Sequence, residues 1–357
     1  MPSAALTRLA RKCDLVLVTP EDLTWARRKA GKGFSYRNDK GRPIKDAAIV
    51  QRLASLAVPP AYGDVRYAPD PRAHLQAVGR DAAGRLQYRY HPDWEKVREW
   101  RKAKRLAKLA AALPKIRRTL SRHLATEEVS KDFALAAVVE LVALTAIRAG
   151  SETYAKEHGT RGATTLLKSH VRIEDEAKAV LAFTAKGGVR VEKEVCMPRF
   201  VAVLQRLKAL PGRRLFQYRG ADGALHPVRA GEVNAFLKEM SGAPISLKDF
   251  RTLVASAGVL ETLAQTIPAG SARARRAQVL EAVRTAAEEL ANTPTVCRKS
   301  YVHATVVTAF EEGTLERFAR LLKGCRSPQK RAEVLAQIVA RTRLEAADAA
   351  GVATQAA

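Results

Sequence analysis

The sequence of 357 residues has few cysteines and no long hydrophobic run. The cysteines are far apart and form no C-x-x-C pair, which excludes a zinc site or a disulfide framework of the usual spacing. They are Cys13, Cys196, Cys297 and Cys325. No stretch of about eighteen apolar residues occurs, and the N-terminus lacks a hydrophobic signal core, so the chain is expected neither to span a membrane nor to be exported. We therefore expect a cytoplasmic protein with free thiols.

The sequence also lacks the motifs of nucleotide and metal sites. No G-x-x-x-x-G-K-[ST] motif is present, and Gly31-Lys32-Gly33 is too short to hold a triphosphate, so use of ATP is not expected. The seven histidines form no H-E-x-x-H motif, and the acidic residues form no D-x-D set that would hold paired Mg²⁺ ions. We expect a protein that works without a cofactor or a metal.

Positive charge is abundant instead. The chain has 62 Lys and Arg against 36 Asp and Glu, a formal net charge of +26. Nucleic acid is the partner that best explains such an excess, and a membrane surface is the second possibility. Hydrophobic residues make up 47% of the chain, enough for a sizeable core, and the length is typical of two domains.

Two sequence patterns divide the chain. Residues 1–91 contain short runs of aromatic and β-branched residues separated by turn signals, typical of a small, mostly β domain, with one helical run at 46–56. Residues 92–345 are mainly helical in pattern, and residues 346–357 form an Ala-rich end that we expect to be frayed. The expected fold class is α+β, with a β-rich domain followed by a larger, mainly α domain.

Two basic residues lie at the ends of predicted elements. Residues 133–147 form an apolar helical run that stops before Gly150, which places Arg148 at its end. Residues 180–195 alternate around a Gly-Gly pair, the signal of a tight β-hairpin, with Lys186 at its tip. Each also has an ordinary structural interpretation, because an Arg can complement a helix dipole and a Lys at a turn is usually a solvated charge.

Tyr301 and Arg251 extend this set. Thr293 and Pro294 supply an N-cap and a first residue for a helix, so Tyr301 is expected to lie on that helix. Alone, Tyr301 is more typical of a packed core residue, and Arg251 of a surface ion pair. A phenol and several cations can nevertheless cleave a phosphodiester without metal, because the cations replace the metal ions and the phenol is the nucleophile.

The sequence context of these residues resembles that of the type IB DNA topoisomerases of the poxviral and bacterial group. Four segments resemble the family's active-site segments in the family's order: residues 147–154 (IRAGSETY), 183–187 (FTAKG), 247–252 (LKDFRT) and 292–301 (NTPTVCRKSY). The resemblance also includes residues 162–168 (GATTLLK) and, in the N-terminal domain, residues 84–90 (GRLQYRY). It covers most of the chain and implies a helical catalytic domain of the topoisomerase IB and tyrosine recombinase type, with a small β-hairpin sheet.

The resemblance also implies a role for each catalytic residue. Tyr301 attacks the scissile phosphate and becomes joined to the 3′ end of the cut strand, while Lys186 protonates the departing 5′ oxygen. Arg148 and Arg251 hold the nonbridging oxygens, and Arg148 also assists proton transfer. Asn292 occupies a position where the family most often has His. Its amide can donate one hydrogen bond to a nonbridging oxygen but brings no positive charge.

Five further residues are implied as DNA-binding. They are Gln87, Tyr88, Tyr90, Tyr154 and Lys248. The first three lie on a predicted strand that would enter a groove of duplex DNA, although the two tyrosines could instead pack within their own sheet. Tyr154 corresponds to a phosphate-contacting tyrosine, and Lys248 to a lysine that supports the catalytic site.

The implied function is relaxation of supercoiled duplex DNA without ATP or metal. One strand is cut through a 3′-phosphotyrosyl intermediate, the free end rotates, and the strand is religated. A monomer without an obligate protein partner, associated with the nucleoid, is expected.

Two alternatives remain open from the sequence. A tyrosine site-specific recombinase shares the Arg, Lys, Arg, Tyr chemistry. Recombinases, however, usually show His-x-x-Arg where this chain has Lys248-Asp249-Phe250-Arg251, and they tend to have a helical N-terminal domain. A basic architectural protein without catalysis would need only the charge.

Overall fold

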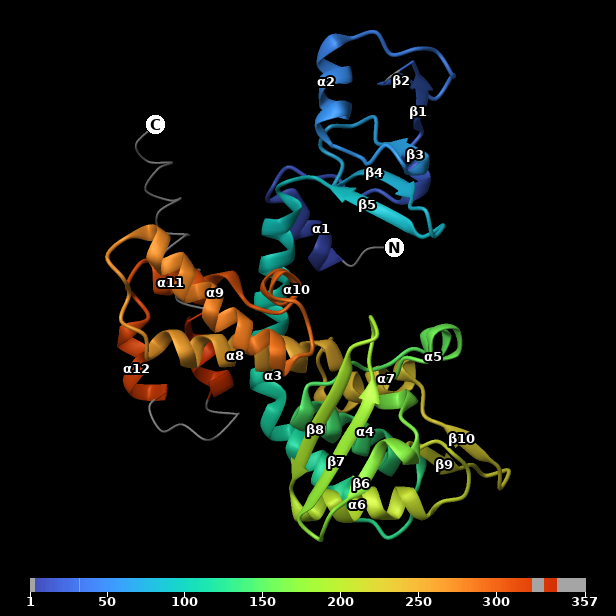
Figure 1. Ribbon diagram of the computed structural model, residues 1–357, viewed down its shortest axis with the longest axis vertical. Coiled ribbons are helices and arrows are strands. Elements are labelled where there is room, and N and C mark those ends of the chain that lie inside the picture. The colour runs from blue at the N-terminus through green and yellow to red at the C-terminus, as the bar shows by residue number, and fades with distance from the viewer. Residues whose placement is uncertain (1–3, 32, 323–330, 339–357) are drawn as a thin grey trace. The chain divides into compact units, whose positions relative to one another are not determined.

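The computed structural model describes residues 4–31, 33–322 and 331–338 (Figure 1). Cys325 and the predicted tail at residues 346–357 lie outside these ranges. The chain separates into two compact units, Met1–Lys102 and Ala103–Ala357. The first is built around a β-sheet and the second is mainly helical, which confirms the predicted α+β class.

The first unit contains an antiparallel sheet of five strands in the order β2-β1-β3-β4-β5. The strands are β1 (Trp25–Ala30), β2 (Gly33–Arg37), β3 (Gly63–Tyr67), β4 (Leu75–Arg80) and β5 (Leu86–Tyr90). Its helices are α1 (Ala4–Arg11), the 3-10 helix η1 (Pro20–Asp22) and α2 (Ala47–Ser55), and α3 (Trp94–Leu124) begins within it. Leu53 of α2 is fully buried in one cluster with Tyr36 and Tyr67, so α2 packs on the sheet.

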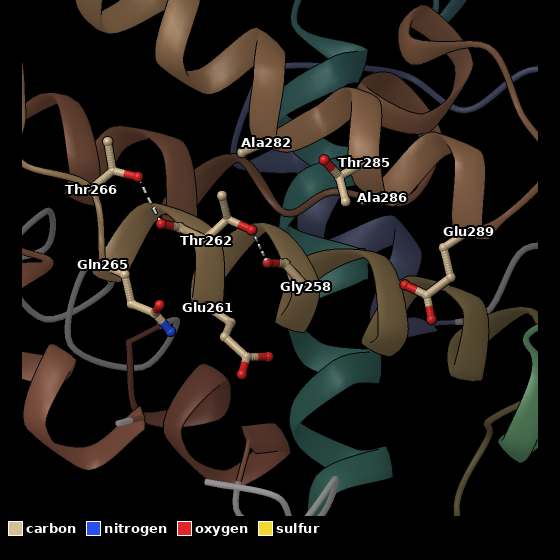
Figure 2. A pocket seen from close by; sticks show the side chains of 9 residues that line it. All are labelled: Gly258, Glu261, Thr262, Gln265, Thr266, Ala282, Thr285, Ala286 and Glu289. Carbon is tan, nitrogen blue, oxygen red and sulfur yellow. Dashed lines mark hydrogen bonds between the residues drawn. The ribbon is translucent and has the colours of Figure 1, made fainter. Parts of the chain in front are cut away.

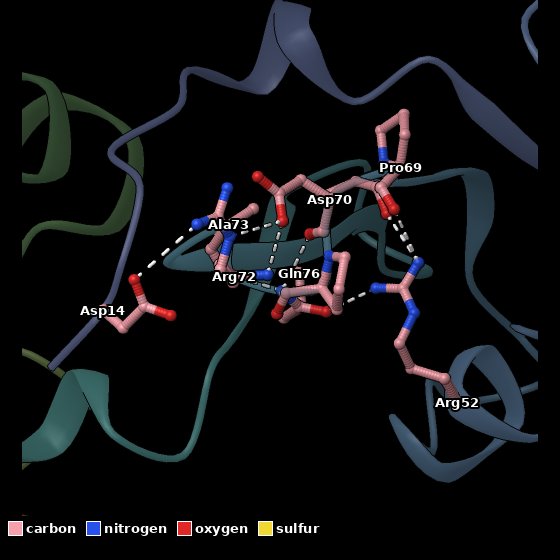
Figure 3. A network of polar contacts seen from close by, with 9 residues as sticks. Asp14, Arg52, Pro69, Asp70, Arg72, Ala73 and Gln76 are labelled. Atoms are coloured by element: carbon pink, nitrogen blue, oxygen red, sulfur yellow. Dashed lines mark hydrogen bonds and ion pairs between the residues drawn. The ribbon is translucent and has the colours of Figure 1, made fainter.

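A buried polar network fixes the loop that precedes β4 (Figure 3). The Gln76 side chain, only 2% exposed, donates to the carbonyl oxygens of Pro71 and Ala73 at 2.9 and 2.7 Å. Its Oε1 accepts from Arg52 Nη1 at 2.8 Å, and Arg52 Nη2 donates to the Ala68 carbonyl oxygen at 2.9 Å. Because buried polar groups need hydrogen-bond partners, these contacts tie α2 to the start of β4 and steady the β4–β5 hairpin.

The second unit carries most of α3, the helices that follow it and two small antiparallel sheets (Figure 1). Its further helices are α4 (Lys131–Thr145), α5 (Glu152–His158), η2 (Ala163–Thr165), η3 (Lys168–His170), α6 (Pro198–Ala209), α7 (Ala230–Ser241), α8 (Leu247–Ala264), α9 (Ala272–Glu289), α10 (Pro294–Ser300), α11 (Ala304–Glu311) and α12 (Glu316–Leu322). Residues 331–338 are also helical. The sheets comprise β6 (Val171–Ile173), β7 (Lys178–Thr184) and β8 (Arg190–Cys196), and β9 (Gln217–Arg219) with β10 (Leu225–Pro227). Within the described ranges, no helix is long and apolar enough to cross a membrane.

Helix α4 lies in the core of the second unit. Its N-terminus is capped by Ser130, whose hydroxyl accepts from the Phe133 amide at 3.3 Å, and most of its residues are buried. The helix ends at Thr145, two residues before the predicted end, because Ala146 adopts a left-handed conformation with φ 52°. The chain therefore turns sharply just before Arg148.

The predicted β-hairpin with Lys186 at its tip is confirmed. Strands β7 and β8 pair up to Thr184 and Arg190, and the Ala185 amide closes the turn by donating to the Val189 carbonyl oxygen at 2.7 Å. The Gly-Gly pair after Lys186 has φ values of 83° and 75°, a conformation that residues with a Cβ adopt only at a cost. The turn therefore depends on both glycines.

Tyr301 does not lie within a helix, contrary to the prediction. Helix α10 begins at Pro294 behind the N-cap Thr293, as predicted, but it ends at Ser300, and Tyr301 is its C-cap residue. The buried Ser256 hydroxyl of α8 donates to the Tyr301 carbonyl oxygen at 2.9 Å and accepts from the His303 amide at 3.0 Å. These two bonds satisfy backbone groups at the turn between α10 and α11, and so hold Tyr301 at the end of its helix.

Candidate active site

Tyr301 and Arg251 are in contact in the core of the second unit. The Arg251 side chain is 3% exposed and Tyr301 is 9% exposed, and the Arg251 Cζ atom lies 4.8 Å from the centroid of the tyrosine ring. Arg251 Nη2 donates to the Leu290 carbonyl oxygen at 3.0 Å, and Nη1 donates to the Ala146 carbonyl oxygen. The guanidinium is thus held between the end of α4 and the end of α9.

Arg148 and Asn292 form a second contact beside this one. Arg148 Nη2 donates to Asn292 Oδ1, and Nη1 donates to the Ala291 carbonyl oxygen at 3.4 Å. The Asn292 side chain follows α9 directly, so one short segment orients both arginines. The structure therefore brings together Arg148, Arg251, Asn292 and Tyr301, which lie far apart in the sequence.

Two hydrogen-bond donors in this group are unused within the described part of the chain. Arg251 Nε and Asn292 Nδ2 are both buried and have no hydrogen-bond partner there. A buried donor without a partner costs about 1–3 kcal/mol, and more when it is charged. Because nonbridging phosphate oxygens are strong acceptors, a bound phosphodiester would satisfy such donors.

The positive charges change the acidity of Tyr301. Burial by itself raises the pKa of the phenol, but the charges of Arg251, Arg148 and Lys248 lower it, and Arg251 has the largest of these effects. The net result is a pKa below the usual value of a tyrosine. The site thus favours the phenolate, the form that acts as a nucleophile.

Lys248 and Lys186 are placed differently. Lys248, at the start of α8, is exposed, and its Nζ lies 5.8 Å from the centroid of the Tyr301 ring. Lys186 is also exposed, and its Nζ lies 4.9 Å from the ring centroid of Tyr154 on α5. Lys186 therefore contacts Tyr154 and not Tyr301, whereas the other four predicted catalytic residues form two neighbouring contacts, Arg251 with Tyr301 and Arg148 with Asn292.

The predicted DNA-binding residues of the first unit lie together on β5. The rings of Tyr88 and Tyr90 stack at a centroid distance of 6.1 Å, and each residue is 44% exposed. Tyr90 also stacks on Trp94 at 6.2 Å. Gln87 Nε2 donates to Asp81 Oδ2 at 2.9 Å. Exposed, stacked tyrosines on an edge strand offer both apolar surface and hydroxyl groups to a partner.

Three residues near the site were not predicted from the sequence. Ser256 fixes the backbone of Tyr301, and Arg161 and Lys193 line a small cavity together with the two arginines at positions 148 and 251. Lys193 carried a recognisable signal, since its spacing of two residues from Val191 and from Val195 places all three on the inward side of β8. Ser256 and Arg161 had no such signal, because their roles come from contacts between distant elements.

A groove between α8 and α9 (Figure 2) borders this site, because Glu289 lines both the groove and the small cavity beside Arg148 and Arg251. It is lined mainly by small and polar side chains and by the carboxylates of Glu261 and Glu289. None of the predicted site residues lines it. No Arg or Lys is among the described residues that line the groove, so it offers a phosphate no cation and does not compete with the cluster around Tyr301 as a phosphate site.

Comparisons with known proteins agree with the fold. Residues 91–325 match the family model for the catalytic core of eukaryotic DNA topoisomerase I, and residues 33–81 match the model for the N-terminal domain of bacterial DNA topoisomerase IB. The DNA topoisomerase 1B of Acanthamoeba polyphaga mimivirus is 29% identical over 286 residues, which cover 77% of this chain and 84% of that protein.

The core model covers about two thirds of the chain, and the protein therefore belongs to the type IB DNA topoisomerase family. It is an isomerase that relaxes supercoiled DNA by transient cleavage and religation of one strand. The N-terminal match and the β-rich first unit also separate it from the recombinase alternative, for which a helical N-terminal domain was expected.

Proposed function

We propose that Tyr301 is the nucleophile of strand cleavage and that Arg148, Arg251 and Asn292 hold the scissile phosphate. The observation that carries this assignment is the buried phenol in contact with the Arg251 guanidinium, next to two buried donors without partners. The arginines stay charged at any physiological pH, so they replace the metal ions that other phosphodiester-cleaving enzymes use.

The reaction follows from these positions. The Tyr301 phenolate attacks the phosphorus, the bond to the 5′ oxygen breaks, and the strand becomes joined to the enzyme through a 3′-phosphotyrosyl bond. Arg251 Nε and Asn292 Nδ2 donate to the nonbridging oxygens as negative charge grows on them. Because the new bond is again a phosphodiester, the free 5′ hydroxyl can attack it in reverse, and religation needs no ATP.

Lys186 is proposed as the acid that protonates the leaving 5′ oxygen. Its side chain is exposed at a turn and lies over the ring of Tyr154, so it remains free to reach a DNA strand laid across both. Tyr154 would then contact a phosphate with its hydroxyl. An alkoxide is a poor leaving group without a proton, which makes such an acid necessary.

The two units are proposed to act on one duplex. We assign DNA binding to the domain at residues 1–91, through Gln87, Tyr88 and Tyr90, and catalysis to residues 92–345. A duplex gripped by both, with only one side of the nick held covalently, can release torque by rotation of the free end. All proposed catalytic groups belong to one chain, so a monomer without an obligate partner, acting in the cytoplasm at the nucleoid, suffices.

Identification of the covalent residue tests this assignment. The protein is mixed with a DNA duplex that contains a nick just to the 3′ side of the cleavage site, so that the short downstream fragment with the free 5′ hydroxyl diffuses away and the adduct is trapped. After digestion, mass spectrometry should find the nucleotide on the peptide that contains Tyr301. An adduct on any other residue would contradict the assignment, and the Tyr301→Phe variant is the control that should give no adduct.

A further inference from the structure

Three arginines gather next to the active site around a single carboxylate. Arg214 Nη2 donates to Glu152 Oε2, which forms an ion pair. Arg161 lies close enough to interact electrostatically with both members of this pair and with Arg213. Within the described ranges neither the Arg161 nor the Arg213 side chain makes a hydrogen bond or an ion pair, and the buried Arg214 Nη1 also has no partner. The three guanidinium groups thus lie near one carboxylate, but only Arg214 is paired with it, and the buried Glu152 Oε1 has no hydrogen-bond partner within the described ranges.

Backbone hydrogen bonds place Arg161 between two parts of the active site. Its amide donates to the Thr184 carbonyl oxygen at 2.7 Å, two residues before Lys186. On its other side, the Ala163 amide donates to the Arg148 carbonyl oxygen at 2.8 Å. Arg161 also lines the small cavity that Arg148 and Arg251 share. Its position is therefore fixed relative to both the hairpin and the arginine that holds the phosphate.

The other two arginines are held in place by a neighbouring segment. The Lys168 amide donates to the Arg213 carbonyl oxygen at 3.0 Å, and Leu167 pairs with Arg214 in an isolated bridge. Glu152 is the first residue of α5, the helix that carries Tyr154, whose ring lies under Lys186. The cluster is thus linked through α5 to Lys186 at the hairpin tip.

The cluster has too much positive charge to be explained as a structural ion pair. Arg161 is half-buried, and its pKa is lowered chiefly by burial and further by the charges of Arg214 and Arg213, with Glu152 acting in the opposite direction. Grouping partly buried like charges costs folding free energy unless an anion lies between them. Guanidinium groups bind phosphate in bidentate geometry, so a phosphate is the anion that fits best.

We propose that Arg161, Arg213 and Arg214 form a binding site for a non-scissile phosphate of the DNA strand, adjacent to the phosphate at Tyr301. The contact fixes the register of the strand, so that the scissile phosphate meets Tyr301. Arg161 offers its positive charge to this phosphate, because within the described ranges no other acceptor binds its side chain. Arg214 contributes its free Nη1 while its Nη2 stays on Glu152.

Binding to modified DNA tests the site. In a Tyr301→Phe background, which cannot cleave, the affinity is measured for duplexes in which one phosphate at a time is replaced by an uncharged methylphosphonate. Both Arg161→Gln and neutralisation of one flanking phosphate should weaken binding on the order of tenfold. When Arg161→Gln is combined with a methylphosphonate at the phosphate that it contacts, the loss of affinity should be no larger than the loss from either change alone. The salt slope of log K should also fall by about 0.9.

Arg199→Gln is the matched control. Arg199 is an exposed arginine near the start of α6, which follows the end of β8 farthest from the hairpin tip, and removing its charge should leave the position-specific pattern unchanged (Figure 1). If Arg161→Gln lowers the affinity by the same factor for every duplex, whichever phosphate is replaced by methylphosphonate, the proposal is wrong. Thermal unfolding checks that Arg161→Gln folds, and the exposed Arg213→Gln repeats the test without disturbing the buried part of the cluster. Inorganic phosphate added at equal ionic strength should not compete with the duplex for this site.

Discussion

The proposed role of Tyr301 as the nucleophile depends on the charges around its ring. A free tyrosine has a pKa of about 10, so little phenolate exists at neutral pH. Burial would reduce that fraction further, but Arg251, Arg148 and Lys248 together outweigh it and lower the pKa. Since both arginines are held by carbonyl oxygens at the ends of α4 and α9, the charge they present is fixed in position.

Removal of the Lys248 charge should shift the pH dependence of cleavage. The Lys248 charge lowers the pKa of Tyr301, so Lys248→Gln raises that pKa and leaves less phenolate at a given pH. The rate of single-turnover cleavage rises with pH as the phenol ionises, and its profile should therefore move to higher pH in the variant. Lys238→Gln, on an exposed position of α7, is the control and should not move the profile. A profile that moves to lower pH in Lys248→Gln would contradict the electrostatic role.

Lys186 should be needed only for an oxygen leaving group. Lys186→Ala removes the proposed acid and should slow cleavage about 10²–10⁴-fold, the usual contribution of general acid catalysis. Replacement of the bridging 5′ oxygen by sulfur gives a leaving group that departs without a proton, so the variant should then cleave nearly as fast as the wild type. If the sulfur substrate is cleaved as slowly as the normal one, Lys186 acts in another way.

At the level of elements, two glycines let the segment after α4 pack closely against a later backbone segment, with Gly150 on the first and Gly162 on the second. A Cβ atom on Gly162 would lie 2.6 Å from the Arg148 carbonyl oxygen and from two backbone atoms of Gly150. Gly150 has a φ of 98°, and the Ala163 and Thr164 amides donate to the Arg148 and Ala149 carbonyl oxygens at 2.8 Å. Two backbone segments therefore run in contact, and that contact places Arg148 beside Asn292 in the candidate site.

Gly162→Ala should separate these segments. Overpacking of this kind costs about 1–3 kcal/mol of unfolding free energy and would displace the arginine at position 148. Chemical denaturation should show the loss of stability, and single-turnover cleavage should slow while DNA binding persists. The matched control is Gly231→Ala, since a Cβ atom there meets no neighbour within 4 Å and Ala is favoured over Gly in a helix. Equal stability and activity of the two variants would show that the close contact is unimportant.

The sequence predicts those elements whose signal is local. The Gly-Gly turn at Lys186, the Thr293-Pro294 helix start and the alternation of the first strands all come from neighbouring residues, and all are present. The end of the helix before Tyr301 could not be predicted in this way, because the Ser256 hydroxyl that accepts and donates at that turn comes from 45 residues earlier.

The same limit applies to the candidate site. Arg148, Arg251 and Tyr301 were predicted as a set because their motifs occur in the family's order, and the structure brings them together. The anchoring of both arginines by the carbonyl oxygens of Leu290 and Ala291 has no sequence signature, since any residue supplies a carbonyl. The proximity of Arg161 to Arg213 and Arg214 likewise has no sequence signature, because it comes from tertiary packing alone.

At the level of the whole molecule, the first unit is proposed to supply affinity and the second to supply chemistry. The tyrosines of β5 are exposed and stacked, far in sequence from the catalytic cluster. Changes to them should alter binding and leave the cleavage step itself intact. The net charge of +26 adds a sequence-independent attraction to DNA that falls with salt.

Combined Tyr88→Ala and Tyr90→Ala substitutions should separate these two roles. If each hydroxyl donates to a phosphate, each loss costs about 1.5 kcal/mol or roughly tenfold in affinity, so the double variant should bind on the order of a hundredfold more weakly. The cleavage rate at saturating protein should stay near that of the wild type. Phe34→Ala removes an exposed aromatic residue at the opposite edge of the same sheet and serves as the control. Unchanged affinity in the double variant would mean that the tyrosines only pack on Trp94.

Relaxation of a supercoiled plasmid in EDTA without ATP tests the central claim most directly, because that claim is the replacement of metal ions by protein cations around a tyrosine. The wild-type protein should relax the plasmid fully under these conditions, and Tyr301→Phe should bind the plasmid with similar affinity but leave it supercoiled. Relaxation by Tyr301→Phe, or a wild-type protein that is inactive until metal or ATP is added, would contradict the account.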